Sequence, residues 1–324
     1  MGDINRRPFL LIFLLIALVG TTGILFYSIT NYRDGETSKT QPSSKTRPSY
    51  VLSIGSKNNH RLRAPLNVAT TDNLLYVADS DNGLLSIFSQ TGTFKSSINP
   101  APGAQNVYPL GVAVDQKQRV YLTLTVGSEN KIMVFNAKGS FLYEFPKSAN
   151  GTSTLPPGKP MAVFSANNRL YVTDILDHDI KVYNLDGELV TRFGRPGSAK
   201  GEFSYPNGIV ADTAGYIYVS DSNNGRVQVF DEKGEFSHLF IVPKKNPLAL
   251  PRGIAIDKLG WVHVVDTLRH QVFVFTKQGK FLFTYGKFGT RKDTLSYPNG
   301  VAIDSKTGAI FIADKMNNRV SVWK

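Results

Sequence analysis

The stretch Tyr205-Pro206-Asn207-Gly208-Ile209-Val210-Ala211-Asp212 is followed by Tyr218-Val219-Ser220-Asp221, by Arg226-Val227-Gln228-Val229-Phe230 and by Gly234. The same arrangement occurs six times along the chain. Its proline stands at Pro65, Pro109, Pro160, Pro206, Pro251 and Pro298, with spacings of 44, 51, 46, 45 and 47 residues. A period of this length is typical of propeller blades rather than of helical solenoids. The repeat therefore decides the fold.

Each copy contains short alternating apolar runs rich in Val, Ile, Tyr and Phe and bounded by Gly, Asn or Asp, for instance residues 253–256, 262–265 and 272–275. Such runs indicate strands. Each copy is therefore predicted to form four antiparallel strands, which we call a to d in chain order. The fourth strand is visible at residues 141–145, 189–193, 236–240 and 281–285.

The sixth copy ends at its third strand, residues 319–323, and Lys324 follows as the last residue. Its blade would be left with an open edge, an aggregation hazard that folds of this kind usually close. Residues 50–55 match the pattern of residues 281–286 and stand just before the first copy. We therefore predict an all-β, closed six-bladed β-propeller at residues 50–324, whose last blade is completed by the N-terminal strand.

The pattern Pro-x-Gly-Ile-Ala-Val-Asp, then Ile-Tyr-Val-x-Asp, then Asn-x-Arg-Val-x-Val-Phe resembles the NHL repeat, best preserved at residues 205–236 and 297–323. The resemblance implies a six-bladed propeller used mostly for binding. Members of the family include sensor domains of bacterial membrane kinases, RNA-binding regulators, and relatives that are lyases or metal-dependent hydrolases. The fold alone does not choose among these functions.

Residues 9–30 carry no charge and are dominated by Leu, Ile and Phe. Twenty-two such residues are long enough for a hydrocarbon layer of roughly 30 Å. Arg6 and Arg7 favour a cytoplasmic N-terminus at residues 1–8. We expect a single-pass signal anchor, a flexible polar linker at residues 31–49 and a propeller on the extracytoplasmic side of the cell membrane. A cleaved signal peptide is the alternative, and it also exports the chain.

The chain has no cysteine, which excludes disulfides and thiolate metal sites. An exported protein without cysteine fits a bacterial source better than a eukaryotic one, so we expect a bacterial protein.

Acidic residues recur at two positions of the repeat. The first set is Asp115, Asp212, Asp257 and Asp304, and the second is Asp79, Asp174, Asp221, Asp266 and Asp314. A blade needs its parts six times, whereas a site at the hub is needed once. We therefore interpret these acids as turn caps and inter-strand hydrogen-bond acceptors. Asp79-Ser80-Asp81-Asn82-Gly83 resembles the start of a calcium loop, but it lacks the closing Glu and coincides with the repeated turn, so we reject it as a metal site.

The two residues after each proline are expected to lie at the central channel. The lyase resemblance implies histidines there, and the chain has none at those positions. Asn67, Asn207 and Asn299 are predicted to line the channel, and their oxygens suit calcium, but no Glu accompanies them. We therefore expect no cofactor, neither Ca nor Zn. A metal-dependent hydrolase or lyase at the channel mouth stays as the alternative function, and no catalytic residue is predicted.

The loops from strand d into the next blade are the long ones, and they carry twelve basic residues against only Glu202 and Asp293. Long loops on a rigid scaffold often bind partners, and a one-sided positive field attracts anions. Arg252 and Lys131 extend this patch toward the hub and over the second blade. The predicted ligand-binding residues are Arg61, Arg63, Lys131, Arg195, Lys244, Lys245, Arg252, Lys287, Arg291 and Lys292.

The sequence favours a binding or scaffold module for an anionic wall polymer, an acidic glycan or an acidic protein. Nucleic acid fits the charge but requires a cytoplasmic chain, so it is not expected. Stacking aromatics occur in these loops at Phe203, Tyr205, Phe288 and Tyr297. Tyr205 and Tyr297 stand at the repeat position, so we expect them in the core rather than at a nucleic-acid surface.

Overall fold

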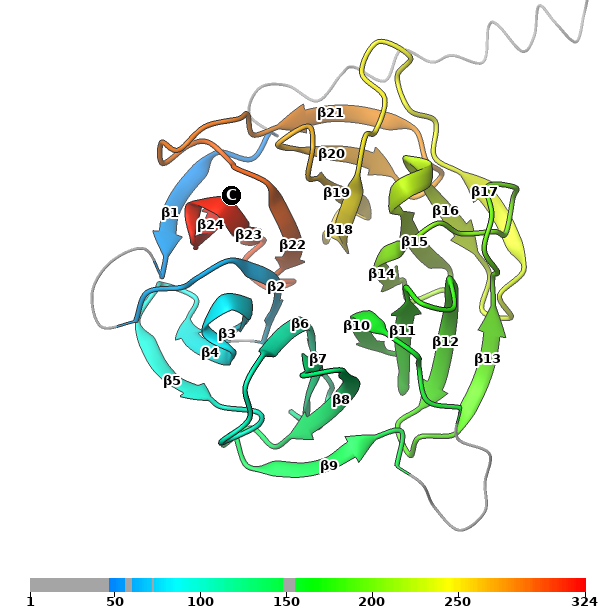
Figure 1. Ribbon diagram of the computed structural model, residues 1–324. Helices are drawn as coiled ribbons and strands as arrows, with labels where there is room; N and C mark the ends of the chain where they lie inside the picture. Colours follow the sequence, from blue (N-terminus) through cyan, green and yellow to red (C-terminus); the bar gives the residue numbers. More distant parts are fainter. Residues whose placement is uncertain (1–46, 56–59, 72, 148–154) are drawn as a thin grey trace, which may run out of the picture. The chain divides into compact units, whose positions relative to one another are not determined.

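The computed structural model describes residues 47–55, 60–71, 73–147 and 155–324. Arg47–Lys324 form one compact unit of six four-stranded antiparallel sheets, arranged in a ring (Figure 1). The all-β, six-bladed propeller prediction is thus confirmed. The expected signal anchor at residues 9–30 lies outside the described residues, as do residues 1–8 and 31–46. In the described ranges, no helix has the length and apolar character needed to cross a membrane.

The strands follow the repeat blade by blade. Blade 1 contains β2 (Pro65–Thr70), β3 (Leu74–Asp79), β4 (Leu84–Ser89) and β5 (Phe94–Ile98). Blade 2 contains β6 (Val107–Val114), β7 (Val120–Val126), β8 (Glu129–Phe135) and β9 (Phe141–Phe145). Blade 3 contains β10 (Pro160–Ala166), β11 (Arg169–Asp174), β12 (Asp179–Asn184) and β13 (Leu189–Phe193).

The second half of the ring repeats this order. Blade 4 contains β14 (Pro206–Ala211), β15 (Ile217–Asp221), β16 (Arg226–Phe230) and β17 (Phe236–Leu239). Blade 5 contains β18 (Pro251–Ile256), β19 (Trp261–Asp266), β20 (Gln271–Thr276) and β21 (Phe281–Tyr285). Blade 6 contains β22 (Pro298–Ile303), β23 (Ile310–Asp314), β24 (Arg319–Trp323) and β1 (Tyr50–Ile54).

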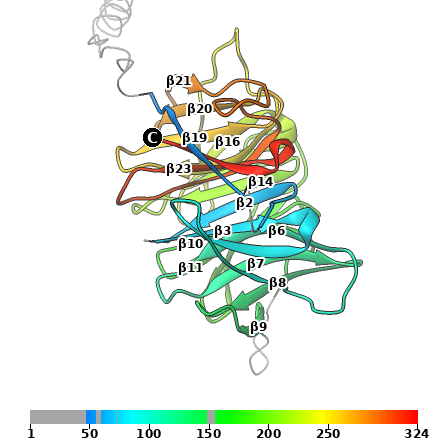
Figure 2. The same ribbon diagram turned by 90° about the vertical axis from the view of Figure 1, so that its left-hand side faces the viewer.

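The N-terminal strand closes the last blade, as predicted. β1 pairs with β24 in antiparallel register, with Ser53 opposite Ser321. The Ser49 backbone N–H donates to the Lys324 carbonyl at 2.8 Å, and the Lys324 N–H donates back to Ser49 at 2.9 Å. Figure 1 shows β1 beside β24, and Figure 2 shows the C-terminus next to the blue N-terminal strand from the side. The ring therefore has no open edge at β24.

The hydrophobic core lies between neighbouring blades. One cluster joins Val229 of blade 4 to Val264 and Phe273 of blade 5, and all three side chains are buried. Strands b and c supply most of this core: every residue of β15 and β24 is buried, whereas the outermost strands β13 and β17 contain only half-buried and exposed residues. This distribution follows from the position of each strand in the stack, since b and c are covered on both faces by adjacent blades.

The inner strands approach one another closely at the glycines that follow the repeat proline. A Cβ added at Gly208 would lie 1.9 Å from the Arg252 carbonyl oxygen, and one at Gly253 would lie 2.5 Å from the Asn299 carbonyl oxygen. These contacts involve backbone atoms of the next blade, which have little room to move. Glycine is therefore required at Gly208 and Gly253, where the inner strands of neighbouring blades come closest.

Three of the turns between strands b and c form short 3₁₀ helices. They are η2 (Ser80–Asn82), η3 (Ser222–Asn224) and η4 (Lys315–Asn317). The residues that end them, Gly83, Gly225 and Asn318, adopt the left-handed conformation with φ of 66°, 61° and 52°. Gly and Asn tolerate this region better than other residues, which explains their presence at these points of the repeat.

Candidate binding face and central channel

The acid at the end of strand b fixes the loop that leads into its own blade. Asp221 Oδ1 accepts a hydrogen bond from the Ser204 backbone N–H at 2.7 Å, and Asp314 Oδ1 accepts one from Ser296 at the same distance. The Asn223 N–H, in the b–c turn, donates to the Ser204 carbonyl at 3.0 Å. The d–a loops and b–c turns therefore share one face of the ring, which we call the loop face.

The acid at the end of strand a caps a tight turn on the opposite face. Asp212 Oδ1 accepts hydrogen bonds from the backbone N–H groups of Ala214 and Tyr216, both at 3.0 Å. Asp257 caps the equivalent turn of blade 5 in the same way, through Leu259 and Trp261. The interpretation of the repeated acids as caps and inter-strand acceptors is confirmed. Their recurrence within the repeat therefore serves the scaffold.

Half of the basic residues predicted to bind ligand are exposed on the loop face and form no ion pair within the described ranges. They are Arg61, Arg63, Lys244, Lys245 and Lys292. They lie on three consecutive loops, which lead into blades 5, 6 and 1. Unpaired cations on one half of the ring leave that half with a positive field available to a partner.

Four other predicted residues already have acidic neighbours. Arg195 pairs with Glu202 at 2.9 Å, and Lys131 lies 2.7 Å from Glu129, whose pKa is lowered by the hydrogen bond and charge of Lys131. Lys287 and Arg291 lie 3.5 and 3.9 Å from Asp293. These pairs are exposed, so each contributes little energy. Lys131 and Arg195 nevertheless add less net charge to the face than the unpaired residues do.

The prediction that Tyr205 and Tyr297 lie in the core is wrong, because both side chains are exposed. Tyr205 and Tyr297 are 46% and 42% exposed, because positive φ values of 53° and 47° turn them out of the strand direction. Phe288 is 65% exposed, whereas Phe203 is fully buried. The loop face therefore carries aromatic side chains beside its cations.

Histidines of the b–c turns hold these tyrosines in place. His178 Nδ1 accepts from the Tyr205 backbone N–H at 3.0 Å, and His270 Nδ1 accepts from Tyr297 at 3.0 Å. The rings meet edge to face, with centroids 4.7 and 4.6 Å apart. Phe288 packs on the other side of His270, at 4.6 Å. The sequence analysis gave His178 and His270 no role, since the pairing joins residues of different blades.

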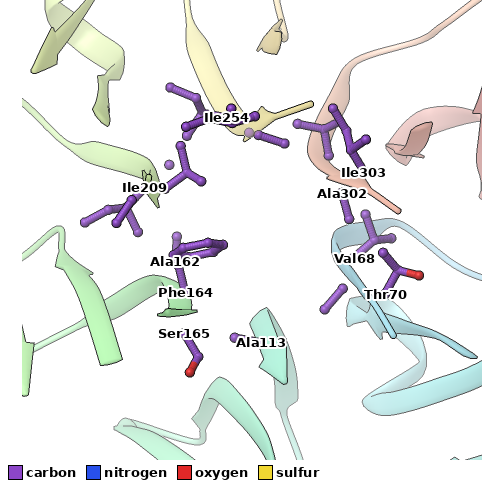
Figure 3. A pocket seen from close by; sticks show the side chains of 18 of the residues that line it. Val68, Thr70, Ala113, Ala162, Phe164, Ser165, Ile209, Ile254, Ala302 and Ile303 are labelled. Carbon is purple, nitrogen blue, oxygen red and sulfur yellow. The ribbon is translucent and has the colours of Figure 1, made fainter. Parts of the chain in front are cut away.

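A cavity of about 520 Å³ occupies the channel. Apolar side chains from the inner strands surround it, among them Val68, Ile209 and Ile254, with the ring of Phe164 in the open centre (Figure 3). The cavity extends to the a–b turns, where Asp212, Asp257 and Lys277 line it. Its walls suit an apolar or amphipathic molecule.

The described channel lacks the histidines that the lyase resemblance implies. No histidine is among the described residues that line the cavity. Its two acids are engaged, since Asp212 Oδ2 pairs with Lys277 at 2.9 Å and Asp257 Oδ2 with His263 at 3.1 Å. The remaining histidines bond elsewhere: His60 to Asp79 and Ser86, and His238 to the Lys277 carbonyl.

The three asparagines predicted to line the channel differ in their surroundings. Asn67 lines the cavity, and Asn207 donates to the Tyr205 carbonyl at 2.8 Å. Asn299 is only 5% exposed, and its Nδ2 has no hydrogen-bond partner in the described structure. Arg252, one blade away, is partly buried with an unpartnered Nε, and burial lowers the pKa of its guanidinium.

Sequence reasoning missed a buried charge cluster in blade 3. Asp174, Asp177 and Asp179 lie close enough together to hold a metal ion, but the ammonium of Lys181 lies 2.7 to 2.8 Å from all three carboxylates. Lys181 is fully buried. The only signal in the sequence was a lysine in the middle of an otherwise apolar third strand.

Comparisons with known proteins agree with this architecture. The NHL repeat model matches residues 203–230, and a model described as a 6-bladed beta-propeller matches residues 252–323. The chain thus contains an NHL repeat within a six-bladed β-propeller.

Sequence relatives match only part of the chain. Protein brain tumor of Drosophila melanogaster is 30% identical over 133 residues, which are 41% of this chain and 12% of that protein. Tripartite motif-containing protein 2 of Homo sapiens is 41% identical over 56 residues, 17% of this chain and 8% of that protein. The matches therefore span a small part of each relative's length.

Solved structures share the fold at low identity. A streptogramin B lyase structure has a TM-score of 0.59 at 16% identity, covering 85% of this chain and 98% of the lyase. A structural genomics protein from Bacteroides thetaiotaomicron has a TM-score of 0.62 at 16% identity, covering 86% of this chain and 76% of that protein. At this level of identity the similarity concerns the fold alone.

Proposed function

We propose that this chain is a non-enzymatic binding module that holds an acidic partner protein on its loop face. The observation that carries the proposal is the group of five exposed cations without ion pairs in the described ranges, on three consecutive loops around blades 5 and 6. A positive patch of this kind speeds encounter with an acidic surface and selects against basic ones.

The aromatic cluster of Phe288, His270 and Tyr297 supports a protein partner. The His270 ring packs against Phe288 and against Tyr297, each at a centroid distance of 4.6 Å, and Phe288 and Tyr297 stay exposed. Rigid aromatic side chains next to basic residues are typical of interaction hot spots, because they bury a large area at little cost in side-chain entropy. A purely electrostatic surface for a polymer does not need such a cluster.

We also propose that the propeller works outside the cytoplasm of a bacterial cell, anchored in the membrane by residues 9–30. The uncharged composition of this segment and the preceding Arg6 and Arg7 support the proposal. A topology reporter fused after Lys324 tests it in intact cells. Activity of the reporter on the cytoplasmic side would contradict the proposed location and make nucleic acid the leading ligand.

Charge reversal tests the binding face. The variant Lys244→Glu, Lys245→Glu, Arg291→Glu and Lys292→Glu should lose capture of the acidic partner, and binding by the unaltered chain should weaken as salt rises. A matched control reverses four exposed lysines of the opposite face, namely Lys117, Lys138, Lys233 and Lys280. Equal partner binding by both variants would refute the proposal. Capture of an acidic glycan or wall polymer in place of protein would identify a different ligand for the same face.

The alternative of a metal-dependent hydrolase or lyase is separated from this proposal by metal analysis of the purified chain. A catalytic metal requires about one tightly held ion per chain. The binding proposal expects no stoichiometric metal.

A further inference from the structure

The residues that follow the repeat proline are polar on one side of the hub and apolar on the other. Blades 4, 5 and 6 present Asn207, Arg252 and Asn299 at this position, whereas blades 2 and 3 present Leu110 and Met161. A scaffold position repeated around a ring does not require this asymmetry. Two of these three polar residues, Arg252 and Asn299, belong to blades 5 and 6, whose entry loops also carry unpaired basic residues.

Arg252 and Asn299 lie on neighbouring inner strands, and each has a buried N–H donor without a partner. The donors are Arg252 Nε and Asn299 Nδ2. The strands touch at this level, as a Cβ on Gly253 would meet the Asn299 carbonyl oxygen at 2.5 Å. No carboxylate of the described chain forms an ion pair with Arg252, and Asn299 is 5% exposed.

Buried Arg319 has partners for its guanidinium, whereas Arg252 Nε has none in the described structure. Arg319 is 6% exposed and binds Asp314 at 2.7 Å and the carbonyls of Arg291 and Thr294 at 2.8 and 2.6 Å. An unpaired charge and an unpaired amide are costly to bury. Together, a guanidinium and an amide N–H form a donor set that suits an oxyanion.

The cavity reaches the inner-strand backbone beside Arg252. Gly253, next to Arg252, lines the cavity, and so does Asn67. Asn67 Cγ lies 3.1 Å from the position of a Cβ on Gly300, which follows Asn299. The lining continues along the inner strand through Ile254 and Ile256 to Asp257 at the a–b turn. A molecule with an anionic group at one end and an apolar body matches both parts.

We propose that the channel binds a small amphipathic organic acid, with its carboxylate at Arg252 and Asn299 and its apolar body between Ile209 and Ile254. This site is separate from the loop face and does not depend on the partner proposed above. Binding neutralises the buried guanidinium, satisfies the Asn299 amide and removes the apolar body from water.

The test uses the full chain in lipid nanodiscs and follows thermal unfolding with hexanoate, acetate and hexan-1-ol as probes. Hexanoate should raise the temperature of the unfolding midpoint saturably. Acetate lacks the apolar chain and hexan-1-ol lacks the carboxylate, so each should require at least tenfold higher concentration for the same rise. Any partition of a probe into lipid is the same for all variants.

Arg252→Met and Asn299→Leu should each weaken the hexanoate effect at least tenfold. Arg252→Met should also unfold at the same temperature as the unaltered chain or higher without probe, since it removes an unpaired buried charge. A purely structural arginine would give the opposite result. Lys245→Met, on the loop face, should leave the hexanoate effect unchanged.

Two results would overturn the proposal. One is an unaltered chain that hexanoate does not stabilise, which is expected if only buried water satisfies the two donors. The other is that hexanoate stabilises the Asn299→Leu and Arg252→Met variants as much as the unaltered chain, which would place the probe elsewhere. Because the partner-capture assay uses different residues, its failure is distinguishable from either result.

Discussion

The ammonium of Lys181 lies 2.7 Å from Asp174 Oδ2, and both side chains are fully buried. The same ammonium reaches Asp177 and Asp179 at 2.8 Å. Three carboxylates that resemble a metal site are thus compensated by a side chain of the next strand. Arg192 adds a second positive charge on Asp179. The cluster is a structural element of blade 3, and its energetics can be tested directly.

Lys181→Met should lower the free energy of unfolding by about 3–5 kcal/mol, since it leaves buried carboxylates without their counter-ion. Urea unfolding followed by fluorescence measures the change. Lys245→Met is the control, because Lys245 is exposed and its replacement should change stability by less than about 0.5 kcal/mol. A stable Lys181→Met variant would show that the cluster contributes nothing.

The cluster also predicts a dependence of stability on pH. Burial by itself raises the pKa of Asp174, but the Lys181 ammonium and backbone N–H donors outweigh it and the pKa lies below its ordinary value. The stabilisation is therefore complete above the unfolded pKa of about 3.9 and is lost as pH falls below it toward the folded pKa. Titration of the Asp174 carboxyl by NMR checks this, and a pKa above 3.9 would contradict it.

Gly208→Ala should destabilise the ring strongly. The new Cβ would lie 1.9 Å from the Arg252 carbonyl oxygen, so the inner strands of blades 4 and 5 must separate. We expect a loss of about 3 kcal/mol or more. Gly158→Ala is the matched control, since the atom it approaches, at 3.0 Å, is the end of the flexible Leu176 side chain. Similar thermal midpoints for the two variants would show that the close approach is not required.

Closure by β1 predicts different behaviour for two shortened chains. A chain that starts at Arg47 keeps the pairing between β1 and β24 and should fold as a monomer. A chain that starts at His60 exposes the edge of β24 and should aggregate or lose its cooperative transition. Size-exclusion chromatography and calorimetry distinguish the two. Identical behaviour would mean that the ring is stable without its closing strand.

His270 should titrate below the ordinary histidine pKa. Burial lowers its pKa, and the charges of Asp266 and Asp314 raise it less. The neutral ring also accepts the Tyr297 N–H, so the stabilisation is complete above the unfolded pKa of about 6.5 and is lost as pH falls below it. NMR titration should place the pKa of His270 below the ordinary value of about 6.5. His270→Ala should increase the mobility of the Tyr297 side chain. A His270 pKa above 6.5 is the contrary result.

The sequence predicted the ring because the repeat period, the strand pattern and the missing last strand are all local features. It failed for Tyr205 and Tyr297, since their left-handed conformation depends on hydrogen bonds to histidines of the preceding blade. The charge of Arg252 was visible in the sequence, but its lack of a partner was not. Such pairings join residues of different blades, and no period along the chain encodes them.

Crosslinking from the loop face tests the central claim most directly. A photoreactive phenylalanine analogue at position 288 lies in the aromatic cluster, and one at Phe141, which is 53% exposed on the outer strand β9, is the control. In intact cells, position 288 should give one discrete crosslinked acidic protein that the fourfold charge reversal removes, and position 141 should give none. No crosslink at 288, or the same product from both positions, would contradict the account.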